Sequence, residues 1–291
     1  TQKFMVLNRV VGGQESQILG MLSDQGQGKL LLINPAGIVL GENAVINAND
    51  LVLSTLRLDD SDFKNLVNGK SVAFKDRYND RGKIEIKSGS NLTLNEALRL
   101  YGGKITIADG VEIISKENSS ADIQISAGVE EITDLKDVSS TTYDIGTNVE
   151  IGDANIGTMS NPISDITIKA YKTTLDKTDV VVNGNDNSRH NILIGSKITD
   201  INSSKLLNRS GDIFIANISR GSWSYDNDGS IKTFEAEADP NYEVAIRNSN
   251  INTVKAKDIT VIGGNVTLDH SQLNSGKDIF VGAVKTYDSK D

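Results

Sequence analysis

The sequence predicts an all-β protein built as a right-handed parallel β-helix, and three observations support this prediction. Short strands of the form Ile-x-Ile or Ile-x-Val recur along much of the chain. Their spacing is about 20 residues, or about twice that, which suits a coil of three short strands better than a propeller blade. Corners are marked by glycine and asparagine, with 26 Gly and only 3 Pro. An ordinary β-sandwich is the alternative, although its strands show no fixed recurrence of this kind.

The recurring strand places two isoleucines on one side of the chain, because side chains alternate between the two faces of a strand. When such strands stack at about 4.8 Å, the isoleucines form a continuous aliphatic column. Each buried aliphatic side chain contributes roughly 1.5–3 kcal/mol, so a coil is expected to fold only when its neighbours stack on it. The strands with this pattern are Lys83–Ile86, Lys104–Ile107, Asp122–Ile125, Asp165–Ile168, Asn191–Ile194, Asp212–Ile215, Asp258–Val261 and Asp278–Val281.

The N-terminal stretch is predicted to form the first coils. Leu30–Ile33 is an apolar strand, and the turn Asn34-Pro35-Ala36-Gly37 ends it, because Pro35 fixes φ and Gly37 tolerates a positive φ. Ile38–Leu40 and Ala44–Ala48 follow as further short strands. We expect one β-helix domain over residues 1–291. Residues 1–58 would form N-terminal coils and capping strands, and residues 83–291 would form the stacked coils.

Several segments are predicted to leave the coils. Residues 59–82 are charged and irregular and form an excursion, and insertions are expected near residues 171–190 and 219–241. In the last of these, Asn227-Asp228-Gly229 is a strong hairpin signal. Trp223 and Tyr225 precede that turn and are candidate surface contacts. The segment 95–100 has the composition of a helical turn.

The N-terminal motifs resemble the secretion domain of two-partner secretion exoproteins, the filamentous haemagglutinin family. The resemblance covers residues 5–58 closely. It rests on the Asn34-Pro35-Ala36-Gly37 corner, the following Ile38-Val39-Leu40-Gly41 run and the strand 51–55, with upstream support from residues 7–13 and 16–20. The third position of the corner is Asn in the family and Ala36 here, so any side-chain bond that this Asn makes is absent.

The resemblance implies an N-terminal secretion domain of a large bacterial exoprotein, exported through the periplasm and secreted to the cell surface. In that family an outer-membrane β-barrel transporter recognises the domain through its POTRA domains, and the β-helix then nucleates at the surface. The expected parent protein is an adhesin or haemagglutinin, which implies a host-cell or bacterial surface receptor. A contact-dependent toxin or a haemolysin is the alternative.

The same resemblance assigns the candidate site. The residues given to the secretion motif and to transporter recognition are Asn8, Arg9, Asn34, Pro35, Ala36 and Gly37. The alternative for the corner is a turn that is needed only for stability.

Composition argues against several other classes of protein. The net charge of −9 disfavours binding to nucleic acid or to an anionic membrane surface. The absence of cysteine excludes disulfides and cysteine-based zinc sites. No apolar run approaches the length of about 18 residues that a transmembrane helix needs. We therefore expect no transmembrane segment. We also expect a monomer.

No catalytic residue, cofactor or metal site is predicted, and the chain is expected not to be an enzyme. A polysaccharide-cleaving β-helix is the remaining alternative, which would need clustered Asp for calcium and a base. Asp226 and Asp228 lack EF-hand spacing. The Asp residues that begin the strands are expected to be solvated or capping residues, and His190 and His270 are expected to have surface roles.

Overall fold

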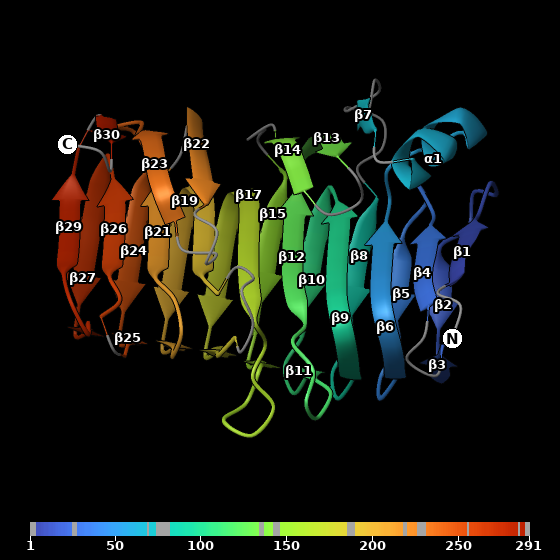
Figure 1. Cartoon of the computed structure of the whole chain (residues 1–291), viewed down its shortest axis with the longest axis horizontal. Coiled ribbons are helices and arrows are strands. Elements are labelled where there is room, and N and C mark those ends of the chain that lie inside the picture. The colour runs from blue at the N-terminus through green and yellow to red at the C-terminus, as the bar shows by residue number, and fades with distance from the viewer. Residues whose placement is uncertain are drawn as a thin grey trace.

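The protein is a parallel β-helix, as predicted, whose coils stack along one long axis (Figure 1). The computed structural model describes residues 4–24, 28–68, 70–73, 82–133, 137–141, 146–184, 190–217, 220–225, 231–254, 256–284 and 286–288. Each coil passes through three parallel sheets, which we name A, B and C in the order in which the chain meets them.

Several long strands bend through a corner and so belong to two sheets. Sheet A contains β1 (Phe4–Arg9), β4 (Gly28–Ile33), the second halves of β6 (Val45–Ser54) and β9 (Asn91–Gly102), β12 (Asp122–Ala127), the first halves of β17 (Asp165–Asp176) and β19 (Ile192–Asn202), β21 (Ile213–Asn217), β26 (Ile259–Gly263) and β29 (Ile279–Ala283).

Sheet B contains β2 (Ser16–Ile18), β5 (Ile38–Leu40), β8 (Lys83–Ile86), β10 (Lys104–Ile107), β15 (Asn148–Ile151), the second halves of β17 and β19, β24 (Glu243–Arg247) and β27 (Asn265–Asp269). Sheet C contains β3 (Met21–Ser23), the first halves of β6 and β9, β11 (Glu112–Ser115), β16 (Asn155–Ile156), β18 (Asp179–Val182), β20 (Lys205–Asn208), β25 (Asn250–Thr253) and β28 (Gln272–Asn274).

The predicted aliphatic columns exist, because repeated isoleucines pair directly in neighbouring coils. In sheet A, Ile166 lies opposite Ile192, and Ile259 lies opposite Ile279. Ile166, Ile192 and Ile259 are buried in one continuous core, whereas Ile279, in the last coil described, is 47% exposed. One predicted step is wrong. Ile105 and Ile123 are not successive rungs of one column, because Ile105 lies in sheet B and Ile123 in sheet A.

The two longest intervals are single coils with insertions. Ile123 pairs directly with Ile166, and Ile213 pairs directly with Ile259. The first interval holds β13 (Val129–Thr133) and β14 (Asp137–Thr141), and the second holds β22 (Arg220–Tyr225) and β23 (Ile231–Glu237). The antiparallel pair β22–β23 lies within the segment 219–241 for which an insertion was predicted.

One prediction of local structure is wrong. Strands β17 and β18 occupy much of segment 171–190 and pair with both neighbouring coils. This part therefore belongs to a turn of the β-helix and is not an insertion. Residues 185–189 of that segment lie outside the described residues. Segment 95–100 is strand within β9, because pairing with β6 and β12 overrides its helical composition.

Every helix or strand described outside the three sheets follows a strand of sheet A, at the corner that leads to sheet B. We call this the AB corner, and its excursions lie along the upper edge of Figure 1. Segment 59–82 contributes α1 (Asp60–Val67) and β7 (Ser71–Ala73), and β7 pairs with β13 from a later excursion. Strand β30 (Thr286–Asp288) pairs with β23.

Near the N-terminus the outer side of sheet A carries a second apolar cluster. Its buried members come from successive rungs and from the chain leading to α1: Leu31, Ile33, Val52, Leu56, Leu58 and Tyr101, with Phe63 of α1 packed against them. Strands β1, β2 and β3 form the first coil and pair in parallel with the next.

The corner between sheets B and C, the BC corner, has the same construction in successive coils. From Lys177 onward, a residue with a left-handed φ is followed by a hydroxyl residue. The hydroxyls of Ser204, Ser249 and Ser271 each accept a backbone N–H of the preceding coil, and that of Thr178 donates to Gly152 O at 2.8 Å. Thr178 N donates to Ser204 Oγ at 3.0 Å, and Ser204 N donates to Ser249 Oγ at 3.0 Å. The left-handed residues are Lys177, Ser203, Asn248 and His270.

The Asp residues that begin the strands were predicted to be solvated or capping residues, and they act as caps. Each carboxylate or amide oxygen accepts the N–H of the equivalent residue in the next coil. Asn191 N donates to Asp165 Oδ1 at 2.8 Å, Asp212 N to Asn191 Oδ1 at 3.0 Å, and Asp258 N to Asp212 Oδ1 at 2.9 Å. The ladder continues from Asp258 to Asp278.

Candidate functional site

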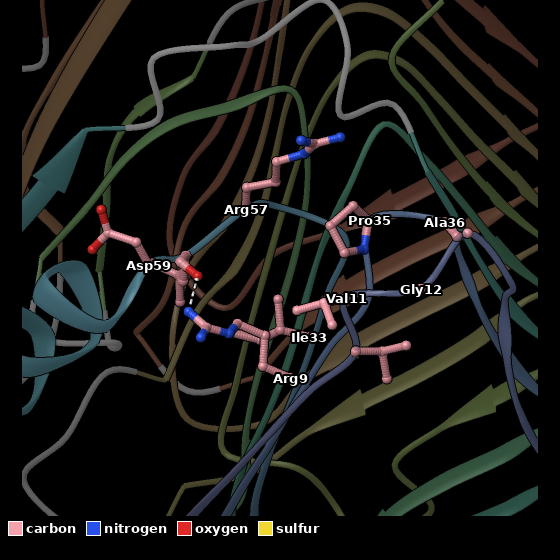
Figure 2. Close-up of a pocket in the computed structure, with 11 residues that line it drawn as sticks. Arg9, Val11, Gly12, Ile33, Pro35, Ala36, Arg57 and Asp59 are labelled. Atoms are coloured by element: carbon pink, nitrogen blue, oxygen red, sulfur yellow. Dashed lines mark hydrogen bonds between the residues drawn. The ribbon is translucent and has the colours of Figure 1, made fainter.

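Three consecutive AB corners converge on one pocket of about 460 Å³, shown in Figure 2. The first corner follows β1, the second follows β4 and contains the Asn-Pro-Ala-Gly turn, and the third leads from β6 to α1. We call this the motif pocket. It is lined by Arg9, Val10, Val11, Gly12, Gly13, Ile33, Pro35, Ala36, Arg57, Leu58 and Asp59.

Asn34 does not line the pocket, because its side chain is fully buried and joins two coils. Its Nδ2 donates to Gln14 O and to Ser16 Oγ, both at 2.9 Å, and its Oδ1 accepts the N–H of Ala36 at 2.9 Å. The N–H of Asn34 donates to Ser54 O at 2.9 Å in the following coil. These bonds hold the first coil against the second and shape the turn.

The rest of the turn divides between the fold and the pocket. Gly37 is buried with a φ of 129°, and its N–H donates to Asn34 O at 3.0 Å, which closes the predicted turn. Pro35 is half-buried and Ala36 is exposed, and both face the pocket. The motif therefore has two buried members that shape the corner and two members that border open space.

Arg9 ties the first corner to the third. Its Nη1 donates to Leu58 O at 2.9 Å, and its Nη2 lies 2.8 Å from the carboxylate of Asp60 (Figure 2 shows the first bond). Asp60 is largely exposed, so this ion pair contributes little to stability by itself. Asn8, the other upstream candidate, is exposed on β1 and does not line the pocket.

The third corner supplies Arg57, Leu58 and Asp59, which were not predicted as site residues. Asp59 caps α1, because its Oδ1 accepts N–H bonds from Ser61 at 2.7 Å and Asp62 at 2.8 Å. Hydrogen bonds from the Ser61 hydroxyl and the Asp62 N–H lower the pKa of Asp59. The signal was present in the sequence, since Asp59 and Asp62 have the spacing of a capping box.

The other predicted site residues lie elsewhere. Trp223 and Tyr225 belong to β22, in a small antiparallel sheet separate from the three helix sheets. Residues 226–230, which include Asp226, Asp228 and the predicted hairpin turn, lie outside the described residues.

The two histidines were both expected at the surface, and this is wrong for one of them. His190 is buried, with a ring that packs against Gly184, whereas His270 is exposed at the BC corner. Within the described part of the chain, no three acidic, His or Cys side chains gather as metal ligands would. No described helix has the length and apolar character that a membrane span requires.

Comparison with known proteins gives one family and one fold. The model of the TPS secretion domain family matches residues 2–215. The chain is similar to the crystal structure of the HMW1 secretion domain from Haemophilus influenzae, with a TM-score of 0.58 and 16% sequence identity, over 95% of this chain and 86% of that chain. At that identity the likeness shows the fold alone. No curated protein matches the sequence.

Proposed function

We propose, because this chain belongs to the TPS secretion domain family, that a cognate outer-membrane transporter recognises it through the motif pocket. Membership makes the chain the secretion domain of a two-partner secretion exoprotein, and such a domain implies a transporter partner. The family is a secretion family and not an enzyme family. The proposal adds where on the domain the transporter binds.

The observation that carries the proposal is that two residues of the motif turn are buried while the other two line the pocket. Asn34 and Gly37 are buried, and their hydrogen bonds serve the fold, whereas Pro35 and Ala36 border a pocket. A turn needed only for stability would have no reason to combine with two further corners around open space. Concave apolar sites bordered by a few polar groups are typical of binding.

The proposal extends to the route and to folding. Recognition takes place in the periplasm by the POTRA domains of the transporter, and the coils then stack one by one at the cell surface. The hydrogen bonds between the strand-start residues Asp165, Asn191, Asp212 and Asp258, which we call the strand-start ladder, support this order. Each side-chain oxygen is placed to accept the N–H of the coil that follows. For the parent protein we propose an adhesin, with β22–β23 as the segment that contacts a surface receptor.

The test fills the pocket without disturbing the fold. Ala36→Trp places a large side chain at an exposed position on the pocket rim, so the free energy of unfolding should change by less than about 0.5 kcal/mol. Secreted yield and affinity for the periplasmic part of the transporter should both fall at least about tenfold.

The matched control is Glu117→Trp, at an exposed turn between β11 and β12 far along the chain. It should be secreted like the natural protein. Normal secretion and normal transporter binding of Ala36→Trp would overturn the proposal.

A further inference from the structure

The chemistry of the motif pocket indicates what kind of partner surface it takes. The floor is apolar, with Ile33 and Leu58 only 1% and 7% exposed. The rim combines two exposed apolar residues, Val11 at 88% exposure and Ala36, with the exposed charged side chains of Arg57 and Asp59. Arg9 is held by Leu58 O and Asp60, so its guanidinium already serves the corner. An aliphatic or aromatic side chain fits such a lining.

The loop on one side of the pocket adds a second observation. Residues 11–13 lie outside the strands, and no hydrogen bond within the described part of the chain uses their backbone N–H or C=O groups. A short run of open backbone groups next to an apolar pocket is what an extended peptide segment pairs with.

The two glycines of this loop leave room for that approach. A Cβ built on Gly12 or Gly13 meets no atom within 4 Å, and neither residue has a left-handed φ. Their role is therefore not imposed by the fold, since neither close packing nor backbone strain requires glycine here. The absence of side chains does let another backbone come close.

From these observations we infer that the motif pocket takes an extended peptide segment, whose backbone pairs with residues 11–13 and whose apolar side chain enters between Val11, Pro35 and Leu58. This inference rests on the proposed function, and the segment belongs to the periplasmic part of the transporter. The apolar side chain gives the contact its affinity, and the backbone pairing sets its direction.

The first experiment measures affinity for the purified periplasmic domains of the transporter. Gly13→Leu should bind at least about tenfold more weakly, because its side chain occupies the path of the incoming backbone. Gly20→Leu is the matched control. Gly20 also has open space around its Cβ and no left-handed φ, but it lies between β2 and β3 and does not line the pocket. This control should bind like the natural protein. Both variants should have the melting temperature of the natural protein.

The second experiment reads the backbone directly. Hydrogen exchange of the natural protein is followed with and without the transporter domains, and the amides of residues 11–13 should slow at least about tenfold in the complex. Tight binding with unchanged exchange at these amides would overturn the peptide pairing and leave the proposed function in place. So would tight binding by Gly13→Leu. Absence of binding by the natural protein would overturn both.

Discussion

The AB and BC corners of the same coils are built on opposite principles. At the BC corner, a left-handed residue and a following hydroxyl recur from Lys177 to Ser271, and each hydroxyl holds a neighbouring coil. At the AB corner, different coils carry the motif turn, the excursion with α1, the single residue Gly103 and the antiparallel pair β22–β23. From Lys177 onward the BC corner is constant, whereas the AB corner differs between coils.

The difference shows where this fold can hold a function. Coils stay in register through groups that repeat, so a position that repeats is committed to stacking. A corner that differs in each coil is released from that demand and can form a unique surface. The motif pocket is made from three such corners, and the buried Asn34, which does not line it, holds two of the coils together.

The largest expected effect is at the structural exception within the AB corner. Asn34→Ala removes the bonds to Gln14 and Ser16 and the bond from the Ala36 N–H, so the free energy of unfolding should fall by about 3 kcal/mol at roughly 1 kcal/mol for each bond. Urea unfolding measures this loss, and secretion should fall in parallel. Asn8→Ala, at an exposed position, should cost less than about 0.5 kcal/mol. An unchanged free energy of unfolding for Asn34→Ala would mean that the side chain at this AB corner does not stabilise the fold.

A smaller loss is expected in the middle of the constant corner. Ser204→Ala leaves the buried Thr178 N–H without its acceptor and removes the bond to Asn202 O, so the free energy of unfolding should fall by about 2 kcal/mol. Ser271→Ala, in the last coil described, should cost less than half as much because this serine is only half-buried. Equal losses at the two serines would contradict a ladder whose groups matter through burial.

The smallest effect concerns charge in the strand-start ladder. Burial raises the pKa of Asp212, with a smaller contribution from Asp258, while the Asp258 N–H, Lys257 and Lys277 act in the opposite direction. A raised pKa in the folded state means that stability is lost as pH rises through it. Asp212→Asn keeps an acceptor oxygen, as Asn191 does one coil earlier, and removes this loss.

Asp212→Asn should therefore melt about 1 °C above the natural protein at pH 7. The gain should shrink towards zero as pH falls below about 4, where the natural Asp is neutral in both states. Scanning calorimetry across this range tests the sign. Asp278→Asn, at the exposed end of the ladder, should show no gain. A lower melting temperature for Asp212→Asn at pH 7 would mean that its charge stabilises the ladder.

Much of the β-helix could be predicted because its core repeats. The spacing between Ile192 and Ile213, or between Ile259 and Ile279, is the length of a coil without insertions, and these pairs stack as expected. The pattern did not say which sheet a strand joins, since Ile-x-Ile occurs in sheets A and B alike. Ile105 and Ile123 were therefore placed in one column although they lie in different sheets.

The errors at the corners have a physical cause as well. Residues 171–176 are mostly polar and suggested an insertion, yet only alternate side chains face inward there, and Thr173 and Leu175 satisfy that need. The true insertion between β12 and β15 was missed because its strands resemble coil strands.

For the candidate site, the motif led to Arg9, Pro35 and Ala36. Arg57 to Asp59 belong to the excursion, and only the fold brings them to the same pocket. Asn8 was carried by the same resemblance, but it lies away from the pocket.

The excursions at the AB corner have a wider consequence. After β13 and β14 the chain returns with Ile166 opposite Ile123, and after β22 and β23 it returns with Ile259 opposite Ile213. The strands of neighbouring coils stay paired in register although segments of different length are inserted between them. A surface loop at this edge could therefore be lengthened or removed while the neighbouring coils stay paired.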